Sequence, residues 1–190
     1  MSAVGEALRE SAIINLTGAV TMVVDDSAFA ADITSSALLG FGIKTRYSLR
    51  SAAEAIEILE DAEIDLLVVD SDMPGMDGFD LVHWLRRSGP PNAFVPVIMT
   101  AAHLPRSRAG KGRDCGANFI ILKPFSAATL LDRIVWVARD PRPFLEVGDY
   151  FGPDRRFRQA DPPGAERRED VIRREKFEAE KAAALADAPR

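Results

Sequence analysis

The chain has 190 residues, of which 47% are hydrophobic and 28% are charged, a composition that predicts one compact domain with some additional chain. Its formal net charge of −5 argues against a nucleic-acid-binding protein. No apolar run approaches the length of a membrane span, the first residues lack the pattern of a signal peptide, and the single cysteine, Cys115, excludes an intramolecular disulfide. We therefore expect a cytoplasmic protein without a membrane partner.

The sequence divides into a short leader at 1–18, a domain at 19–140 and a C-terminal extension at 141–190. Basic and acidic side chains balance in the extension, so the net charge resides in the first 140 residues. Prolines and aromatic residues at 141–164 predict an extended arm. The Ala-, Glu-, Lys- and Arg-rich segment at 165–187 favours a charged helix or disorder.

Within the domain, strand and helix patterns alternate. Buried strands are predicted, in chain order, at 19–24, 44–47, 64–69, 95–99 and 119–122. Helices are predicted after Ser27, with Ile33, Ala37 and Leu38 on the inner face, after the capping box Ser51–Glu54, at 78–87 and after Ser126. This alternation predicts right-handed crossovers and a parallel sheet covered by helices on both faces.

The segment at 103–114 is the exception to the helical pattern. It carries a proline, two glycines and few large apolar residues, so we expect a poor helix that is short or mobile.

Polar side chains follow the predicted strands. Asp25 and Asp26 end the first, Asp70 the third, Thr100 the fourth and Lys123 the fifth. These ends meet at one edge of a parallel sheet, where carboxylates crowded together repel one another unless a hard divalent cation such as Mg²⁺ joins them. With a nearby lysine and hydroxyl, this set is suited to phosphoryl transfer onto a carboxylate.

Four motifs in this order resemble those of the response-regulator receiver domain of two-component signalling. They are VVDD at 23–26, VVDSDMPGMDG at 68–78, VIMTAA at 97–102 and ILKPF at 121–125. The resemblance spans residues 19–138 and implies an α/β fold. This is a doubly wound, flavodoxin-like sheet of five parallel strands in the order 2-1-3-4-5, here followed by an extended or helical tail.

The resemblance also implies roles for individual residues. Asp70 accepts the phosphoryl group, Thr100 and Lys123 contact it, and Asp25, Asp26, Asp70 and the backbone carbonyl of Asp72 bind Mg²⁺. The Lys123–Pro124 peptide bond is expected to be cis, as is usual in this family.

Three positions depart from the family pattern. Ile120 stands where a tyrosine or phenylalanine is common, with Phe119 one residue earlier, so coupling between Thr100 and an aromatic ring is in question. Ala102 offers no group to hold an attacking water, and Asp72 adds a fourth carboxylate near the site.

The resemblance thus implies a phosphorylation-activated response regulator that is not an enzyme beyond gaining and losing its own phosphoryl group. Its donor would be a histidine kinase or phosphotransfer protein. Its output would be a protein contact or homodimer, since no DNA-binding output domain is recognisable. One alternative is a receiver-like interaction module that works without phosphorylation. Another is an aspartyl-phosphate phosphatase of the haloacid-dehalogenase type, which Asp70-Ser71-Asp72 would fit. That superfamily, however, places its acidic pair last in the chain, whereas here Asp25 and Asp26 come first.

Amide hydrogen exchange tests the expected mobility of 103–114. We expect this segment to exchange faster than the central strands, because poor helix propensity leaves its local stability low. Exchange as slow as in those strands, with and without a phosphoryl analogue, would contradict the expectation.

Overall fold

The computed structural model describes residues 16–43, 45–89, 91–104 and 106–155. Most of the predicted leader and the predicted charged helix at 165–187 lie outside them. The strands are β1 (Val20–Val24), β2 (Thr45–Leu49), β3 (Leu66–Asp70), β4 (Val97–Ala101), β5 (Phe119–Leu122), β6 (Phe144–Val147) and β7 (Tyr150–Pro153). The helices are α2 (Ala28–Gly40), α3 (Ala52–Asp61), α4 (Gly78–Leu85), η1 (Asn92–Phe94), α5 (Arg106–Asp114) and α6 (Ala127–Ala138).

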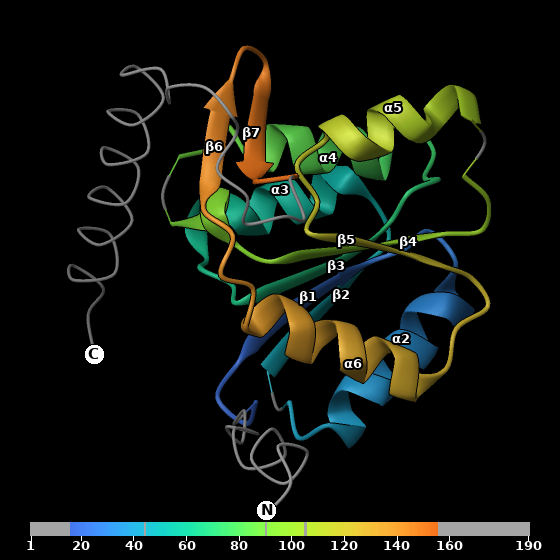
Figure 1. The fold of residues 1–190 in the computed structure, drawn as a ribbon. Helices are drawn as coiled ribbons and strands as arrows, with labels where there is room; N and C mark the ends of the chain where they lie inside the picture. The colour runs from blue at the N-terminus through green and yellow to red at the C-terminus, as the bar shows by residue number, and fades with distance from the viewer. Residues whose placement is uncertain (1–15, 44, 90, 105, 156–190) are drawn as a thin grey trace, which may run out of the picture.

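Five parallel strands form the central sheet in the order β2-β1-β3-β4-β5, which confirms the predicted doubly wound topology. Helices α3, α4 and α5 cover one face and α2 and α6 the other (Figure 1). Successive strand residues alternate between the two layers. Met22 and Val24 pack in the core beside α3 and α4, whereas Val23 packs in the core beside α2 and α6. The sheet is therefore buried on both faces, as its continuous apolar strands predict.

Local signals in the sequence set the starts of the helices. Ser27, Ser51 and Ser126 each accept a hydrogen bond from a backbone N–H in the first turn of the helix that follows, as predicted. The capping box is closed by Glu54, whose carboxylate accepts hydrogen bonds from the Arg50 backbone N–H and the Ser51 hydroxyl.

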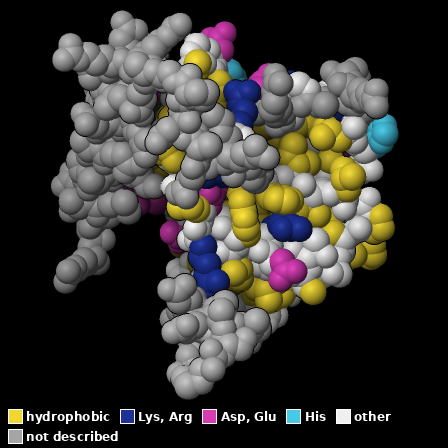
Figure 2. Space-filling model, viewed as in Figure 1, with side chains coloured by type: hydrophobic (Ala, Val, Ile, Leu, Met, Phe, Trp, Pro, Cys, Tyr) yellow, Lys and Arg dark blue, Asp and Glu magenta, His cyan; other side chains and the backbone are white. Residues whose placement is uncertain are grey.

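The surface carries several large hydrophobic side chains. Figure 2 shows hydrophobic side chains gathered between a few charged ones on the face where β5 and α6 lie.

The prediction for the inner face of α2 is wrong at Ile33, a residue that is 51% exposed, whereas Leu38 is buried as predicted. In the described part of the chain, no helix is long and apolar enough to cross a membrane.

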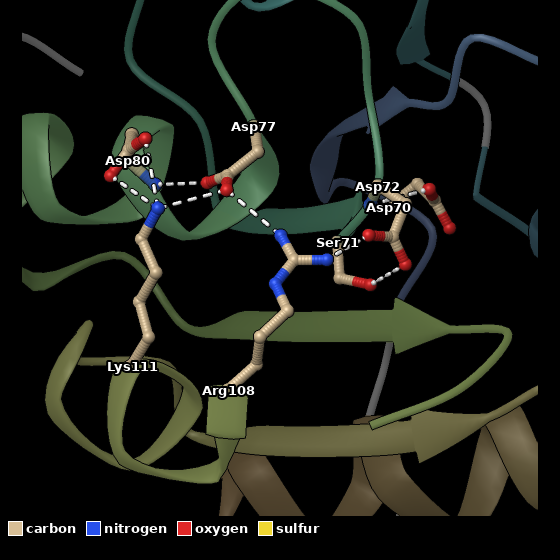
Figure 3. A network of polar contacts seen from close by, with 7 residues as sticks. All are labelled: Asp70, Ser71, Asp72, Asp77, Asp80, Arg108 and Lys111. Atoms are coloured by element: carbon tan, nitrogen blue, oxygen red, sulfur yellow. Dashed lines mark hydrogen bonds and ion pairs between the residues drawn. The ribbon is translucent and has the colours of Figure 1, made fainter. Parts of the chain in front are cut away.

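The segment at 103–114, expected to be a poor helix that is short or mobile, contains the nine-residue helix α5, and its mobility stays a prediction. Nine residues are helical despite their low helix propensity. Two cations of α5 stabilise the helix by pairing with the loop before α4 and with the first turn of α4. Arg108 pairs with Asp72 and Asp77, and Lys111 pairs with Asp77 and Asp80 (Figure 3). Both cations also lie over the ring of Phe79, at 5.1 and 5.9 Å from its centroid.

The first part of the C-terminal extension forms a β-hairpin, so the expected extended arm is only partly right. Strands β6 and β7 pair antiparallel around a two-residue loop, in which Gly148 has a φ of 59°. The rings of Phe144 and Phe151 lie 5.3 and 5.5 Å from that of Phe94, which joins the hairpin to η1. These aromatic residues therefore pack against the body of the domain near α4.

Arg86 lies beneath the hairpin and is only 3% exposed. Its guanidinium lies 5.0 Å from the centroid of the Phe144 ring and donates hydrogen bonds to the carbonyls of Gly116, Ala93 and Val95. Burial lowers the pKa of Arg86 to about 10, yet the side chain stays charged at neutral pH. Arg142 anchors the start of the hairpin by pairing with Asp140 and lying 4.8 Å from the Trp136 ring centroid.

Phe144→Ala tests the packing of the hairpin. We expect the free energy of unfolding to fall by about 1–3 kcal/mol, because the substitution removes a half-buried ring that contacts two other rings and a guanidinium. Urea denaturation followed by circular dichroism measures this change. Val147→Ala, at the exposed end of β6, is the matched control and should cost less than about 0.5 kcal/mol. Equal effects of the two substitutions would show that the hairpin does not pack on the domain in solution.

Asp77→Asn tests the ion pairs of α5. Burial raises the pKa of Asp77, but hydrogen bonds from Lys111, Asp80 and Arg108 and the charge of Lys111 outweigh it and bring the pKa below 3.8. Since asparagine also caps helices, the substitution removes mainly the charge. We expect a loss of about 1 kcal/mol at neutral pH.

This difference between wild type and Asp77→Asn should be constant above the unfolded-state pKa of 3.8 and disappear as pH falls through the lower folded-state value. Urea midpoints between pH 2 and 7 provide the measurement. Asp149→Asn, which alters a fully exposed carboxylate paired with the half-exposed Arg87, should show no comparable pH dependence. A difference that persisted at the lowest pH would exclude the charge of Asp77 as its cause.

Candidate functional site

The carboxyl edge of the sheet brings together the side chains that the sequence places at the strand ends. Asp70 is the last residue of β3 and lies opposite Thr100 of β4 in the register. Asp25 follows β1 directly, and Lys123 follows β5. Asp25, Asp70 and Thr100 are at most 5% exposed, so this edge holds two buried carboxylates.

Lys123 joins those two carboxylates. Its ammonium donates to Asp70 Oδ1 at 2.5 Å and to Asp25 Oδ2 at 2.7 Å. Burial lowers the pKa of Lys123, but the hydrogen bonds and charges of Asp25 and Asp70 outweigh it, so the pKa lies above its usual value. The lysine is therefore charged at neutral pH, as a charge partner for buried carboxylates must be.

The remaining contacts of Asp70 come from its neighbours. The Thr100 hydroxyl donates to Asp70 Oδ1 at 3.4 Å, and the backbone N–H of Asp72 donates to Asp70 Oδ2 at 2.9 Å. The loop after β3 turns back so tightly that a Cβ at Gly78 would lie 2.0 Å from the backbone oxygen of Asp70. Only glycine fits there, so Gly78 helps to fix the end of β3.

Three carboxylates at this edge could hold a metal ion. Oxygen atoms of Asp25, Asp26 and Asp70 all lie within 4.8 Å of one another. With the Lys123 ammonium they leave a formal charge of −2, which one divalent cation would neutralise. The donors are all oxygen, as Mg²⁺ prefers, and Asp26 is exposed, so a bound cation could keep part of its water shell. The residues present thus fit Mg²⁺.

The predicted departures are visible in the structure. The ring of Phe119 lies on the α6 face of the sheet, 5.6 Å from that of Trp136, whereas Ile120 packs in the core on the α5 face. Position 120 therefore presents an isoleucine, and no aromatic ring, to the α5 face of the sheet. The Lys123–Pro124 bond is cis, as expected.

A second layer of charges, not predicted from the sequence, surrounds this site. Arg108 and Lys111 of α5 bind Asp72, Asp77 and Asp80, which belong to the loop after β3 and the start of α4 (Figure 3). Two basic residues three positions apart share one face of a helix, so their spacing carried a signal. That signal was overlooked because no stable helix was expected at 103–114.

Comparisons with known proteins agree with this fold. The family model described as response regulator receiver domain matches residues 21–135. Chemotaxis protein CheY-3 of Vibrio cholerae is 30% identical over 113 residues, which are 60% of this chain and 86% of that protein. The DNA-binding response regulator MtrA of Mycolicibacterium smegmatis is 28% identical over 67% of this chain, but this covers only 56% of MtrA.

Solved structures give the same result. The chemotaxis protein CheY4 of Vibrio cholerae superimposes with a TM-score of 0.58 at 28% identity, covering 63% of this chain and 98% of CheY4. Since the family model spans more than half of the sequence, and the sheet order is the predicted one, family and fold agree. The chain therefore belongs to the response regulator receiver family and contains a CheY-like receiver domain of two-component signalling.

Proposed function

We propose that this receiver domain accepts a phosphoryl group on Asp70 from a phosphohistidine of a histidine kinase or phosphotransfer protein. A carboxylate oxygen of Asp70 attacks the phosphorus, a new P–O bond forms, the P–N bond breaks and the histidine nitrogen leaves. The observation that carries the proposal is the Lys123 ammonium, held 2.5 Å from Asp70 Oδ1 at the carboxyl edge of the sheet.

Each side chain at this edge has a distinct part in the proposed reaction. The Lys123 ammonium, which pairs with the Asp70 carboxylate, can also pair with a negatively charged oxygen of the arriving phosphoryl group. The Thr100 hydroxyl can donate a hydrogen bond to another of these oxygens. Asp25, Asp26 and Asp70, with the backbone carbonyl of Asp72, would hold Mg²⁺. The ion would supply positive charge that offsets the repulsion between carboxylates and phosphoryl group.

The surroundings of the site support a protein as the phosphoryl donor. Three large hydrophobic side chains close in sequence to site residues are exposed. They are Phe29 in the first turn of α2, Met76 in the loop after β3 and Leu122 at the end of β5. Such residues around a charged site can bury apolar area against a partner. We propose that the output is also a protein contact rather than catalysis, and that the protein acts in the cytoplasm, where the buried free Cys115 would stay reduced.

Intact-mass measurement after incubation with acetyl phosphate and Mg²⁺ tests the proposal. We expect a single phosphoryl adduct in the wild type, and none with Asp70→Ala or when Mg²⁺ is removed by a chelator. Asp132→Asn, which alters an exposed carboxylate on α6, is the matched control and should form the adduct as the wild type does. Size-exclusion chromatography of the same samples shows whether phosphorylation produces a homodimer.

No adduct in a wild type that still binds Mg²⁺ would contradict phosphoryl acceptance and favour the phosphorylation-independent module. The position of Phe119 on the α6 face of the sheet, with Ile120 and no aromatic ring on the α5 face, is the observation that favours this second function.

A further inference from the structure

Asp72 places a fourth carboxylate beside the acidic edge, by which we mean the carboxyl edge of the sheet where Asp25, Asp26 and Asp70 lie. Its backbone N–H contacts Asp70, but its side chain is engaged elsewhere. One carboxylate oxygen pairs with Arg108 and the other accepts a hydrogen bond from Ser71 at 3.0 Å (Figure 3). The Asp72 carboxylate is thus neutralised and directed toward α5.

Arg108 is held in place by more than Asp72. Its second terminal nitrogen donates to Asp77 Oδ2 at 2.9 Å, and the guanidinium lies over the Phe79 ring. The hydrogen bond with Asp72 is the main cause that raises the pKa of Arg108, so the positive charge is permanent. The planar guanidinium thereby spans the loop from Asp72 to Asp77, a geometry that suits arginine better than lysine.

We propose that Arg108 is a positioning residue for the reaction at Asp70. Its guanidinium cancels the charge of Asp72 and holds that carboxylate away from the divalent cation. The inference rests on the proposed function and deepens it, because it assigns to α5 a part in setting the cation affinity. With Arg108 in place, the three carboxylates and Lys123 present a formal charge of −2 to the cation. Without Arg108, the nearby charge of Asp72 would add to it.

Two roles of Arg108 predict opposite effects on Mg²⁺ binding. If it neutralises Asp72, its removal leaves an additional negative charge near the cation and binding becomes tighter. If Arg108 only stabilises the conformation of the loop after β3, its removal makes the Asp72 backbone more mobile and Mg²⁺ binding becomes weaker. Removal of Asp72 alone discriminates further, because it leaves the Arg108 charge uncompensated and should weaken binding.

Isothermal titration of the full-length protein with Mg²⁺, without any phosphoryl donor, is the test. At low ionic strength we expect Arg108→Gln to bind Mg²⁺ about three- to tenfold more tightly than the wild type and Asp72→Asn to bind it about three- to tenfold more weakly. The double variant should lie within about twofold of the wild type, and the differences should shrink in 0.5 M KCl, as screening requires. Far-UV circular dichroism establishes that each variant is folded.

Lys111→Gln is the matched control, since Lys111 is a cation of the same helix but pairs with Asp77 and Asp80, outside the acidic edge. Its Mg²⁺ affinity should stay within about twofold of the wild type. The inference is overturned if Arg108→Gln binds Mg²⁺ equally or more weakly than the wild type, or if Lys111→Gln has the same effect as Arg108→Gln.

The two proposals fail separately. Loss of the expected affinity pattern in a protein that forms the Asp70 adduct would overturn the role of Arg108 alone. The expected pattern in a protein that forms no adduct would support Arg108 and overturn phosphoryl acceptance. A wild type that binds no Mg²⁺ would overturn both.

Discussion

The Lys123 ammonium, shared by Asp25 and Asp70, is the contact on which the carboxyl edge depends. Two carboxylates with side chains 5–6% exposed repel each other and have lost most of their hydration, so their burial requires a positive charge between them. The fold supplies it by pairing β5 with β4, and the Lys123 backbone N–H donates to the Ala101 carbonyl at the end of that pairing. A long-range sheet contact therefore sets the electrostatics of the site.

Around this buried layer lies an outer one, in which α5 supplies the cations. Arg108 and Lys111 meet three carboxylates contributed by the loop after β3 and by α4. Single exposed pairs contribute little, but here both cations share Asp77 and also cover the Phe79 ring, so the contacts reinforce one another. Helix α5 has few apolar residues to bury, and this network explains how it is held against the domain.

Sequence patterns predicted the sheet and its carboxyl edge because both depend on short-range signals. A buried strand is a continuous apolar run, and a parallel sheet necessarily gathers residues such as Asp70 and Lys123, which follow such runs. The contacts that hold α5, and the hairpin, were not predicted for the opposite reason. Their stability comes from partners distant in sequence, Asp77 for Arg108 and Phe94 for Phe144, and propensity contains no information about such partners.

The alternation of side chains along β5 explains why Phe119 does not substitute for an aromatic residue at position 120. Neighbouring strand residues point to opposite faces, so Phe119 packs with Trp136 and Arg133 beside α6, whereas Ile120 faces α5. Near Ile120 the helix carries Gly112, whose Cβ, if present, would lie 3.1 Å from the Ile120 side chain. This contact between β5 and α5 is aliphatic and close, with no polar group from Ile120.

The polar contacts described between α5 and the segment that follows Asp70, which comprises the loop after β3 and the start of α4, are those of Arg108 and Lys111. A change of charge at Asp70 would therefore reach α5 through ion pairs, which respond to charge over several ångströms, rather than through the displacement of a ring.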